Sequence, residues 1–287
     1  MPRVIGVGDN VVDKYLHTGI MYPGGNALNF AVFAKKAGVD AAYLGSFGND
    51  RAADHIQSVL QGLSIDISRC RRFEGENGFA RVTLVDGNRV FVPGNAGGVM
   101  RLYPLEFSSG DLAYIRTFQL AHSSCYSYIE PQLQRLKGTG VPLSYDFSSR
   151  IGDEYLRAVC PFVDFAFFSA EESSDEASIV RTIETMHRLG CTVGAATRGK
   201  KGAILLYRGR LYHQTAEPKT AVDTMGAGDS FLTVFLLHFL ASCGWQASRL
   251  LDCSEAAVRA GLQKAARAAA ETCGVGGSFG FGVPFSQ

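Results

Sequence analysis

The pattern of hydrophobic and polar residues along this chain changes repeatedly between a strand-like and a helix-like period. Short apolar runs such as residues 3–8 are typical of buried strands, whereas residues 50–63 place Ile56, Val59 and Leu60 on one helical face. Strands are expected at residues 3–8, 39–44, 79–85, 89–92, 118–122, 143–147, 162–168, 191–196, 203–207 and 211–214. Helices are expected at residues 27–37, 50–63, 131–137, 175–189, 232–240 and 254–272. This alternation predicts an α/β fold, a doubly wound and mostly parallel sheet flanked by helices.

A glycine-rich stretch at residues 223–231 carries the clearest chemical signal. Gly226, Ala227 and Gly228 are small enough for the backbone to approach a ligand closely, and an apolar helical run follows them. The first amides of such a helix have no intrahelical partner and suit a phosphate or another developing anion. Asp229 would repel phosphate, but it could accept the proton of an attacking hydroxyl. The pattern favours phosphoryl transfer over a plain helix start in which Asp229 is only an N-terminal charge.

Polar residues follow the first predicted strand and open the next helix, and strand ends are where open α/β sheets bind ligands. Asp9 and Asp13 follow the strand, and Asp13 could receive two sugar hydroxyls or be a turn residue. Gly25, Asn26 and Asn29 enter the helix. Their amides could read hydroxyls, or they could be an N-cap and an ordinary helix residue.

Later strand ends carry further polar residues. His122 could line a sugar pocket, but a hydrogen-bonded structural role is favoured. Arg150 could hold a phosphate as a charged fork or form a surface ion pair. Because a parallel sheet brings its carboxyl ends to one edge, these residues are expected to meet despite their separation in sequence.

Composition restricts the class of protein and its partners. The 287 residues suffice for one large α/β domain or two smaller ones, and the net charge of +1 favours neither nucleic acid nor an anionic membrane. No apolar run approaches the ~20 residues of a bilayer span, and the N-terminus begins a strand rather than a targeting leader. The seven dispersed cysteines predict free thiols in a reducing cytoplasm and disfavour a zinc site.

Two motifs resemble those of a known family. Residues 223–229 read Asp-Thr-Met-Gly-Ala-Gly-Asp and resemble the C-terminal motif of the ribokinase-like (PfkB) carbohydrate kinases, although Thr233 and Val234 depart from the family pattern beyond it. Residues 24–48 resemble the N-terminal motif in residue type and spacing. The resemblance implies a single kinase domain over residues 1–287 that transfers the γ-phosphate of ATP to a sugar hydroxyl. The implied catalytic set is Asp229 as general base, with Gly226, Ala227 and Gly228 stabilising the migrating charge.

The resemblance also assigns ligand-binding residues. The sugar side is expected to comprise Asp9, Asp13, Gly25, Asn26, Asn29, Arg89 and Asn95. The ATP side is expected to comprise Arg150, Thr197, Gly199, Gly202, Gly226, Gly228 and Cys273. Mg²⁺ would accompany ATP, with Glu172 ordering water around it, and Asp223 would help to hold a monovalent cation such as K⁺. Ser148 and Ser169 stand where the family has asparagine, so Glu171 stays open as an alternative to Glu172.

A small β-sheet lid is expected over the sugar site. Residues 79–85 and 89–92 alternate in hydrophobicity around Asp86-Gly87-Asn88, which predicts a hairpin. In the family, such a hairpin and an early segment form a lid that often carries a dimer contact. The resemblance therefore implies lid strands inserted at about residues 14–22 and 73–96, about four strands in all, and a homodimer through the lid.

The substrate is less well defined than the reaction. A narrower resemblance, to bacterial fructoselysine 6-kinases, rests on residues 8–13, 24–29, 164–167 and 223–231. It implies phosphorylation of the 6-hydroxyl of a fructosamine such as fructoselysine. A simple sugar such as fructose or ribose, or a nucleoside, stays open as an alternative. A sugar-binding regulator without catalysis is disfavoured by Asp229 and its turn, and a dinucleotide oxidoreductase by the lack of Gly-x-Gly-x-x-Gly after the first strand.

Overall fold

The computed structural model describes residues 1–85, 88–171 and 173–285, without the side chains of residues 84–89. Its main sheet has eight strands, in the spatial order β14 (Arg210–Gln214), β13 (Ala203–Tyr207), β12 (Val193–Thr197), β11 (Phe165–Ser169), β10 (Leu143–Asp146), β9 (Leu120–Ser124), β1 (Arg3–Val7) and β4 (Asp40–Leu44). Strands β12 to β4 pair in parallel, whereas β13 and β14 extend the sheet in antiparallel fashion. This pairing confirms the predicted mostly parallel sheet.

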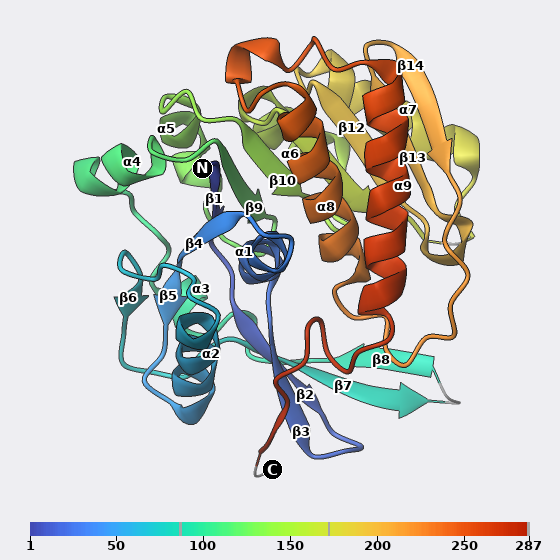
Figure 1. Ribbon diagram of the computed structural model, residues 1–287. Helices are drawn as coiled ribbons and strands as arrows, with labels where there is room; N and C mark the ends of the chain where they lie inside the picture. The colour runs from blue at the N-terminus through green and yellow to red at the C-terminus, as the bar shows by residue number, and fades with distance from the viewer. Residues whose placement is uncertain (86–87, 172, 286–287) are drawn as a thin grey trace.

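Helices cover both faces of the main sheet (Figure 1). On one face, α1 (Asn26–Lys36), α8 (Ala227–Ser242) and α9 (Glu255–Thr272) share one apolar core with the sheet. The other face carries α4 (Ser109–Ile115), α5 (Leu133–Lys137), α6 (Asp153–Val159) and α7 (Glu176–Arg188) over a second core. Most of α8 is buried, because it packs between α1, α9 and the sheet. The predicted doubly wound arrangement is therefore confirmed.

The remaining helical elements are short or peripheral. They are α2 (Arg51–Gly62), α3 (Val99–Leu102) and the 3₁₀ turns η1 (Glu130–Gln132), η2 (Cys160–Phe162), η3 (Gly199–Lys201) and η4 (Ala247–Arg249). The predicted helix at residues 131–137 is divided, because Pro131 lies in η1 and the α-helix begins only at Leu133. The structure also adds α3, α4 and α6, which the hydrophobic pattern did not indicate.

A second sheet lies below the main sheet in Figure 1, at the end where β1 leads into β2. It is five-stranded, and we call it the lid: β15 (Val283–Pro284), β3 (Ile20–Gly24), β2 (Val11–Tyr15), β7 (Phe79–Val85) and β8 (Asn88–Val92). The prediction of about four strands is corrected here, because the C-terminal segment adds β15 against β3. The first lid segment also begins earlier than predicted, at Val11 rather than residue 14.

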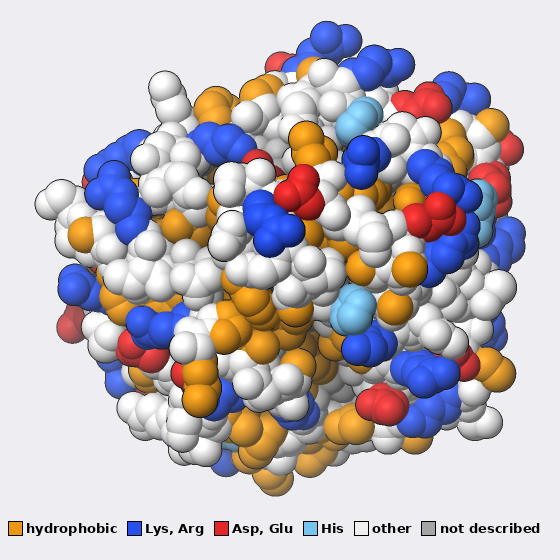
Figure 2. Space-filling view, turned by 45° about the horizontal axis from the view of Figure 1, so that its top comes forward, with side chains coloured by type: hydrophobic (Ala, Val, Ile, Leu, Met, Phe, Trp, Pro, Cys, Tyr) orange, Lys and Arg blue, Asp and Glu red, His pale blue; other side chains and the backbone are white. Residues whose placement is uncertain are grey.

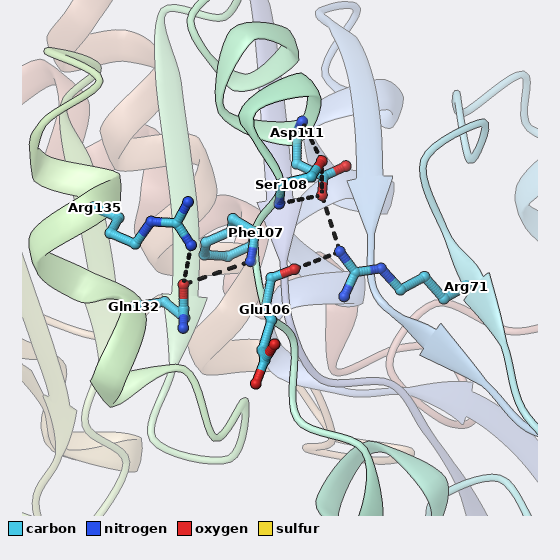
Figure 3. Close-up of polar contacts among 7 residues, drawn as sticks. All are labelled: Arg71, Glu106, Phe107, Ser108, Asp111, Gln132 and Arg135. Atoms are coloured by element: carbon cyan, nitrogen blue, oxygen red, sulfur yellow. Dashed lines mark hydrogen bonds and ion pairs between the residues drawn. The ribbon is translucent and has the colours of Figure 1, made fainter.

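A polar network holds the segment before α4 against a small two-stranded sheet formed by β5 (Ser46–Phe47) and β6 (Arg71–Arg72) (Figure 3). The Arg71 guanidinium donates to the Glu106 carbonyl (2.6 Å) and to Asp111 Oδ2 (2.9 Å). Ser108 and Asp111 form a capping box at the start of α4. Burial acts to raise the pKa of Asp111, but the hydrogen bonds from Ser108 and the charge of Arg71 outweigh it and lower that pKa. The network fixes the start of α4.

The charges on the surface and the length and hydropathy of the helices are relevant to binding of nucleic acid or a membrane. Figure 2 shows acidic and basic side chains intermingled on the face in view, in keeping with the net charge of +1. Among the described residues, the helices fall short of the combination of length and hydropathy that crossing a bilayer requires.

Candidate active site

The glycine turn, residues 223–229, leads directly into α8. Gly226 is the N-cap of that helix and adopts φ 71°, a left-handed conformation that glycine tolerates best. A Cβ at this position would lie 2.6 Å from Ser278 Cβ and 2.9 Å from Ser278 Cα. At Gly228, by contrast, an added Cβ would meet no atom within 4 Å. The turn is therefore packed against the C-terminal segment at Gly226 and has open space beside Gly228.

Asp223 joins three segments at the start of this turn. Its Oδ1 accepts the N–H of Met225 at 3.0 Å. Its Oδ2 accepts the Tyr15 hydroxyl of β2 (2.5 Å) and the N–H of Gly277 (2.9 Å). One carboxylate thus ties the glycine turn to the lid and to the C-terminal segment. These bonds are those of a structural brace, and a role for Asp223 in holding a monovalent cation stays a prediction.

Asp229 is a half-buried carboxylate in the first turn of α8, in the wall of a cavity. Asn29 Nδ2 of α1 donates to its Oδ2 at 2.7 Å. Burial raises the pKa of Asp229 well above the usual range, the nearby charge of Asp146 adds to that shift, and the Asn29 hydrogen bond opposes it. A carboxylate whose basicity is raised in this way suits proton abstraction from a hydroxyl near neutral pH.

Two asparagines in the first turn of α1 each hold one carboxylate, the buried Asp146 and the half-buried Asp229. Asn26 and Asn29 lie three residues apart and so share one helix face. Asn26 Nδ2 donates to Asp146 Oδ2 at 2.7 Å, as Asn29 does to Asp229. Burial raises the pKa of Asp146 to about 6. Sequence reasoning missed Asp146 as a site residue, although it lies directly at the end of β10, where the other candidates were sought.

Asn29 keeps one polar atom for a ligand. Its Oδ1 is buried and has no hydrogen-bond partner within the part of the chain that the structure describes. Because Asn29 lines the cavity next to Asp229, this oxygen could accept a hydrogen bond from a sugar hydroxyl. The same side chain would then orient both the base and the substrate.

Asp9 caps the N-terminus of α1. Its carboxylate accepts the N–H groups of Asn26 (2.6 Å) and Ala27 (3.2 Å). It also accepts the hydroxyls of Ser124 (2.8 Å) and Ser127 (2.9 Å). These four donors account for its burial, and they show Asp9 positioning the helix that carries the two asparagines. A direct contact between Asp9 and the substrate stays a prediction.

One cavity of about 520 Å³ lies between the lid and the main domain, within the usual size range of small-molecule sites. We call it the lid cavity. Its wall includes these predicted residues: Asp9, Asp13, Gly25, Asn26, Asn29, Arg150 and Asp229. It also includes residues that the sequence did not single out: Phe79, Phe91, Met100, Tyr128 and Met225. The cavity therefore combines carboxylates and amides with aromatic and aliphatic walls.

Other predicted residues lie elsewhere in the described part of the chain. The Asn95 side chain is outside the cavity wall, with its Oδ1 accepting the N–H of Phe79 and its Nδ2 donating to the Asn77 carbonyl. The Arg89 side chain and Glu172 lie outside the described residues. His122 is buried, stacked on Phe30 and hydrogen-bonded to Ser144, which supports its structural interpretation.

The predicted ATP residues Thr197, Gly199, Gly202 and Cys273 do not line the lid cavity. Gly202 has φ 84°, and a Cβ there would lie 1.9 Å from the Gln214 carbonyl oxygen, so its glycine is required by the fold of the hairpin. The Cys273 carbonyl accepts the N–H of Asp223, which places the C-terminal segment beside the glycine turn. Contacts of these residues with ATP stay predictions.

The chain offers no preformed metal cage among the residues that the structure describes, where no three His, Cys, Asp or Glu side chains converge. Mg²⁺ is usually held by one or two carboxylates together with nucleotide phosphates, so it needs no such cage. The open space beside Gly228 and the outward first amides of α8 fit a phosphate group. When bound, ATP with Mg²⁺ supplies the phosphoryl group and part of the countercharge.

Comparison with known proteins defines the class to which this fold and site belong. Residues 3–278 match the family described as pfkB family carbohydrate kinase. The chain belongs to this family and is an ATP-dependent sugar kinase. It is 43% identical to the fructosamine kinase FrlD of Bacillus subtilis, over 99% of this chain and 95% of that protein. It is 32% identical to the fructoselysine 6-kinase of Shigella flexneri, over 88% and 92%.

Solved structures support the fold. The structure of Arabidopsis thaliana ribokinase complexed with ribose and ATP matches with a TM-score of 0.75 at 22% identity, covering 97% of this chain and 94% of that one. The fructokinase of Xylella fastidiosa with bound ATP matches with a TM-score of 0.78 at 16% identity, covering 96% and 94%. The predicted ribokinase-like architecture is thus confirmed.

Proposed function

We propose that this sugar kinase phosphorylates the 6-hydroxyl of a fructosamine, with fructoselysine as the reference substrate. The observation that carries the proposal is the place of Asp229, a half-buried carboxylate of raised pKa, in the same cavity as Asp13 and Asn29. Two relatives that share most of their length with this chain are named for fructosamine and fructoselysine. The lid cavity also has apolar walls, which suit the aliphatic part of a sugar–amine conjugate.

The proposed reaction follows from the roles of a few groups. Asp13 and the Asn29 amide orient the sugar, and the hydroxyl to be phosphorylated lies against Asp229. Asp229 accepts the hydroxyl proton as the new O–P bond forms and the bond to ADP breaks. The first amides of α8 stabilise charge on the transferring group. The lid excludes water and so limits hydrolysis.

A screen of ADP release tests the substrate assignment. Fructoselysine, other fructosamines, fructose, ribose and nucleosides are each offered with MgATP, and the product is located by NMR. We expect kcat/KM to be highest for a fructosamine, with phosphate on O6. Turnover of nucleosides or simple sugars alone would show the fructosamine assignment to be wrong. Heat stabilisation by sugar without ADP release would instead indicate a binding protein.

The pH dependence of this activity should reflect the raised pKa of Asp229. The base must be ionised, so kcat/KM is expected to fall as the pH drops through that pKa, which lies well above the usual range of an aspartate. The charge of Asp146 contributes to the shift, and its own pKa is about 6. Asp146→Asn should therefore move the acid limb of the kcat/KM profile to lower pH. An unchanged limb in that variant would contradict the electrostatic coupling.

Several parts of the proposal extend beyond the reaction. We propose that residues 1–287 form one kinase domain with an inserted lid, and that two copies associate through the lid. Mg²⁺ would enter with ATP, and K⁺ would bind near Asp223.

A further inference from the structure

Arg150 projects from the loop after β10 and is held in place by three contacts. Its backbone N–H donates to the Phe147 carbonyl at 2.8 Å, which closes the turn that follows the strand. Its Nη1 donates to the Cys125 carbonyl at 3.0 Å, and its guanidinium carbon lies 5.0 Å from the centre of the Tyr126 ring. These contacts fix the guanidinium in the wall of the lid cavity.

The charge of Arg150 has no acidic partner among the side chains that the structure describes. Within that part of the chain it forms no ion pair, and the Cys125 carbonyl is the acceptor of its side-chain hydrogen bonds. An arginine has five N–H donors in a fixed fork, so several remain for a ligand. A planar carboxylate matches this fork in a bidentate arrangement.

The neighbours of Arg150 indicate which ligand it faces. It shares the cavity with Asp13, Asn29 and Asp229, the groups proposed to hold the sugar and accept its proton. The residues expected to bind ATP at the Thr197 turn do not line this cavity. Arg150 is therefore placed on the sugar side rather than on the nucleotide side.

The apolar part of the lid cavity wall suits an aliphatic linker. Tyr126 and Tyr128 belong to it, with the Tyr126 hydroxyl 3.1 Å from Ser148 Oγ and the Tyr128 hydroxyl donating to the Ala96 carbonyl at 2.8 Å. Because both hydroxyls have protein partners, the rings are held in place as apolar surfaces. Met100 adds a flexible apolar side chain to the same wall.

We propose that Arg150 is a specificity-determining residue that binds the carboxylate of the amino-acid part of the substrate. The kinase would then select glycated amino acids over glycated amines that lack a carboxylate. This inference rests on the proposed fructosamine kinase function and adds to it the chemical class of the amine.

Substrate pairs that differ only by a carboxylate test this directly. Lysine that carries the fructosyl group on Nε is compared with fructosyl-cadaverine, which is the same compound without the α-carboxylate. Fructosyl-glycine is compared in the same way with fructosyl-methylamine. For the native enzyme we expect kcat/KM to favour the carboxylate in at least one pair, and the pair that shows it identifies an ε- or an α-glycated amino acid. In Arg150→Gln, the ratio of kcat/KM with the carboxylate to kcat/KM without it should fall by roughly 10- to 100-fold, which corresponds to the loss of a charged hydrogen bond.

Two further variants keep the test specific. Arg135→Gln removes a positive charge from α5, where the side chain donates to Gln132 (Figure 3), and should leave the ratio unchanged. Arg150→Lys keeps the charge without the fork and should give an intermediate ratio. Circular dichroism and thermal unfolding confirm that each variant is folded.

Each other outcome has a distinct meaning. A rise in KM for ATP in Arg150→Gln, equal for all sugars, would overturn the inference in favour of a phosphate contact. Equal loss of kcat/KM within each pair would overturn it in favour of a general structural role. A native enzyme that phosphorylates fructosamines without preferring the carboxylate would overturn the inference alone. Failure to phosphorylate any fructosamine would overturn the proposed function as well.

Discussion

Asp229→Asn is expected to lower kcat by at least ~100-fold, the lower end of the contribution of a general base. Asparagine has nearly the same shape but cannot accept the hydroxyl proton. The Asn29 amide that donates to Asp229 at 2.7 Å can still donate to the asparagine carbonyl, so the helix start should keep its geometry. Sugar and ATP binding should therefore persist while turnover is lost.

Steady-state kinetics and calorimetric titration of sugar and nucleotide separate these two effects. The matched control is Asp54→Asn, which removes an acid from the first turn of α2, outside the wall of the lid cavity. If Asp229 were only a favourable charge at a helix N-terminus, both variants would lose a little stability and keep their turnover. Near-normal kcat in Asp229→Asn would remove this residue from the role of base.

Gly226→Ala is expected to abolish most of the activity by distorting the glycine turn. The residue has φ 71°, and a Cβ would lie 2.9 Å from the backbone Cα of Ser278, which cannot rotate away. Strain of this kind costs about 1–3 kcal/mol of folding free energy. The amides that follow would move, and losing such a donor typically lowers kcat by ~100-fold or more.

Gly228→Ala is the matched control for stability. Its Cβ would meet no atom within 4 Å, and alanine favours a helix over glycine by ~1 kcal/mol. The Tm of Gly228→Ala, from differential scanning calorimetry, should therefore equal or exceed that of the native protein, whereas the Tm of Gly226→Ala should fall. Native Tm and native kcat in Gly226→Ala would show that the left-handed turn is dispensable.

Most strands and helices could be located because strands such as β1 and β11 are short apolar runs and helices such as α2 and α7 have a periodic apolar face. Helix α8 was located by its continuous apolar run after the glycine turn. The lid was harder to predict. β15 comprises only Val283–Pro284, which is too short to show a period, and its pairing with β3 joins opposite ends of the chain. The helices α4 and α6 are two turns long and carry little pattern of their own.

The candidate site was predicted in its residue types and less well in its contacts. Asp13 was sought after the first strand, whereas it lies within β2 of the lid, and Asp229, indicated by the glycine turn, lies in the first turn of α8. Both line the lid cavity. The partners of Asn26 and Asn29 could not be predicted, since each bond to a carboxylate spans more than 100 residues of chain. Arg150 was assigned to ATP from its motif, whereas its contacts with Cys125 and Tyr126 depend on the tertiary fold.

The Asp223 carboxylate has a mechanical consequence. Tyr15 of β2 and the N–H of Gly277 bind the same oxygen, 2.5 and 2.9 Å away, while the other oxygen holds Met225 in the glycine turn. Any swing of β2 away from the main domain must break the bond to Tyr15 or carry Asp223 with it. A sugar that draws β2 inward would thus set the spacing of the turn at the same moment. Binding of the sugar would therefore affect the glycine turn, where the phosphate of ATP is expected to lie, through the Asp223 carboxylate that both segments share.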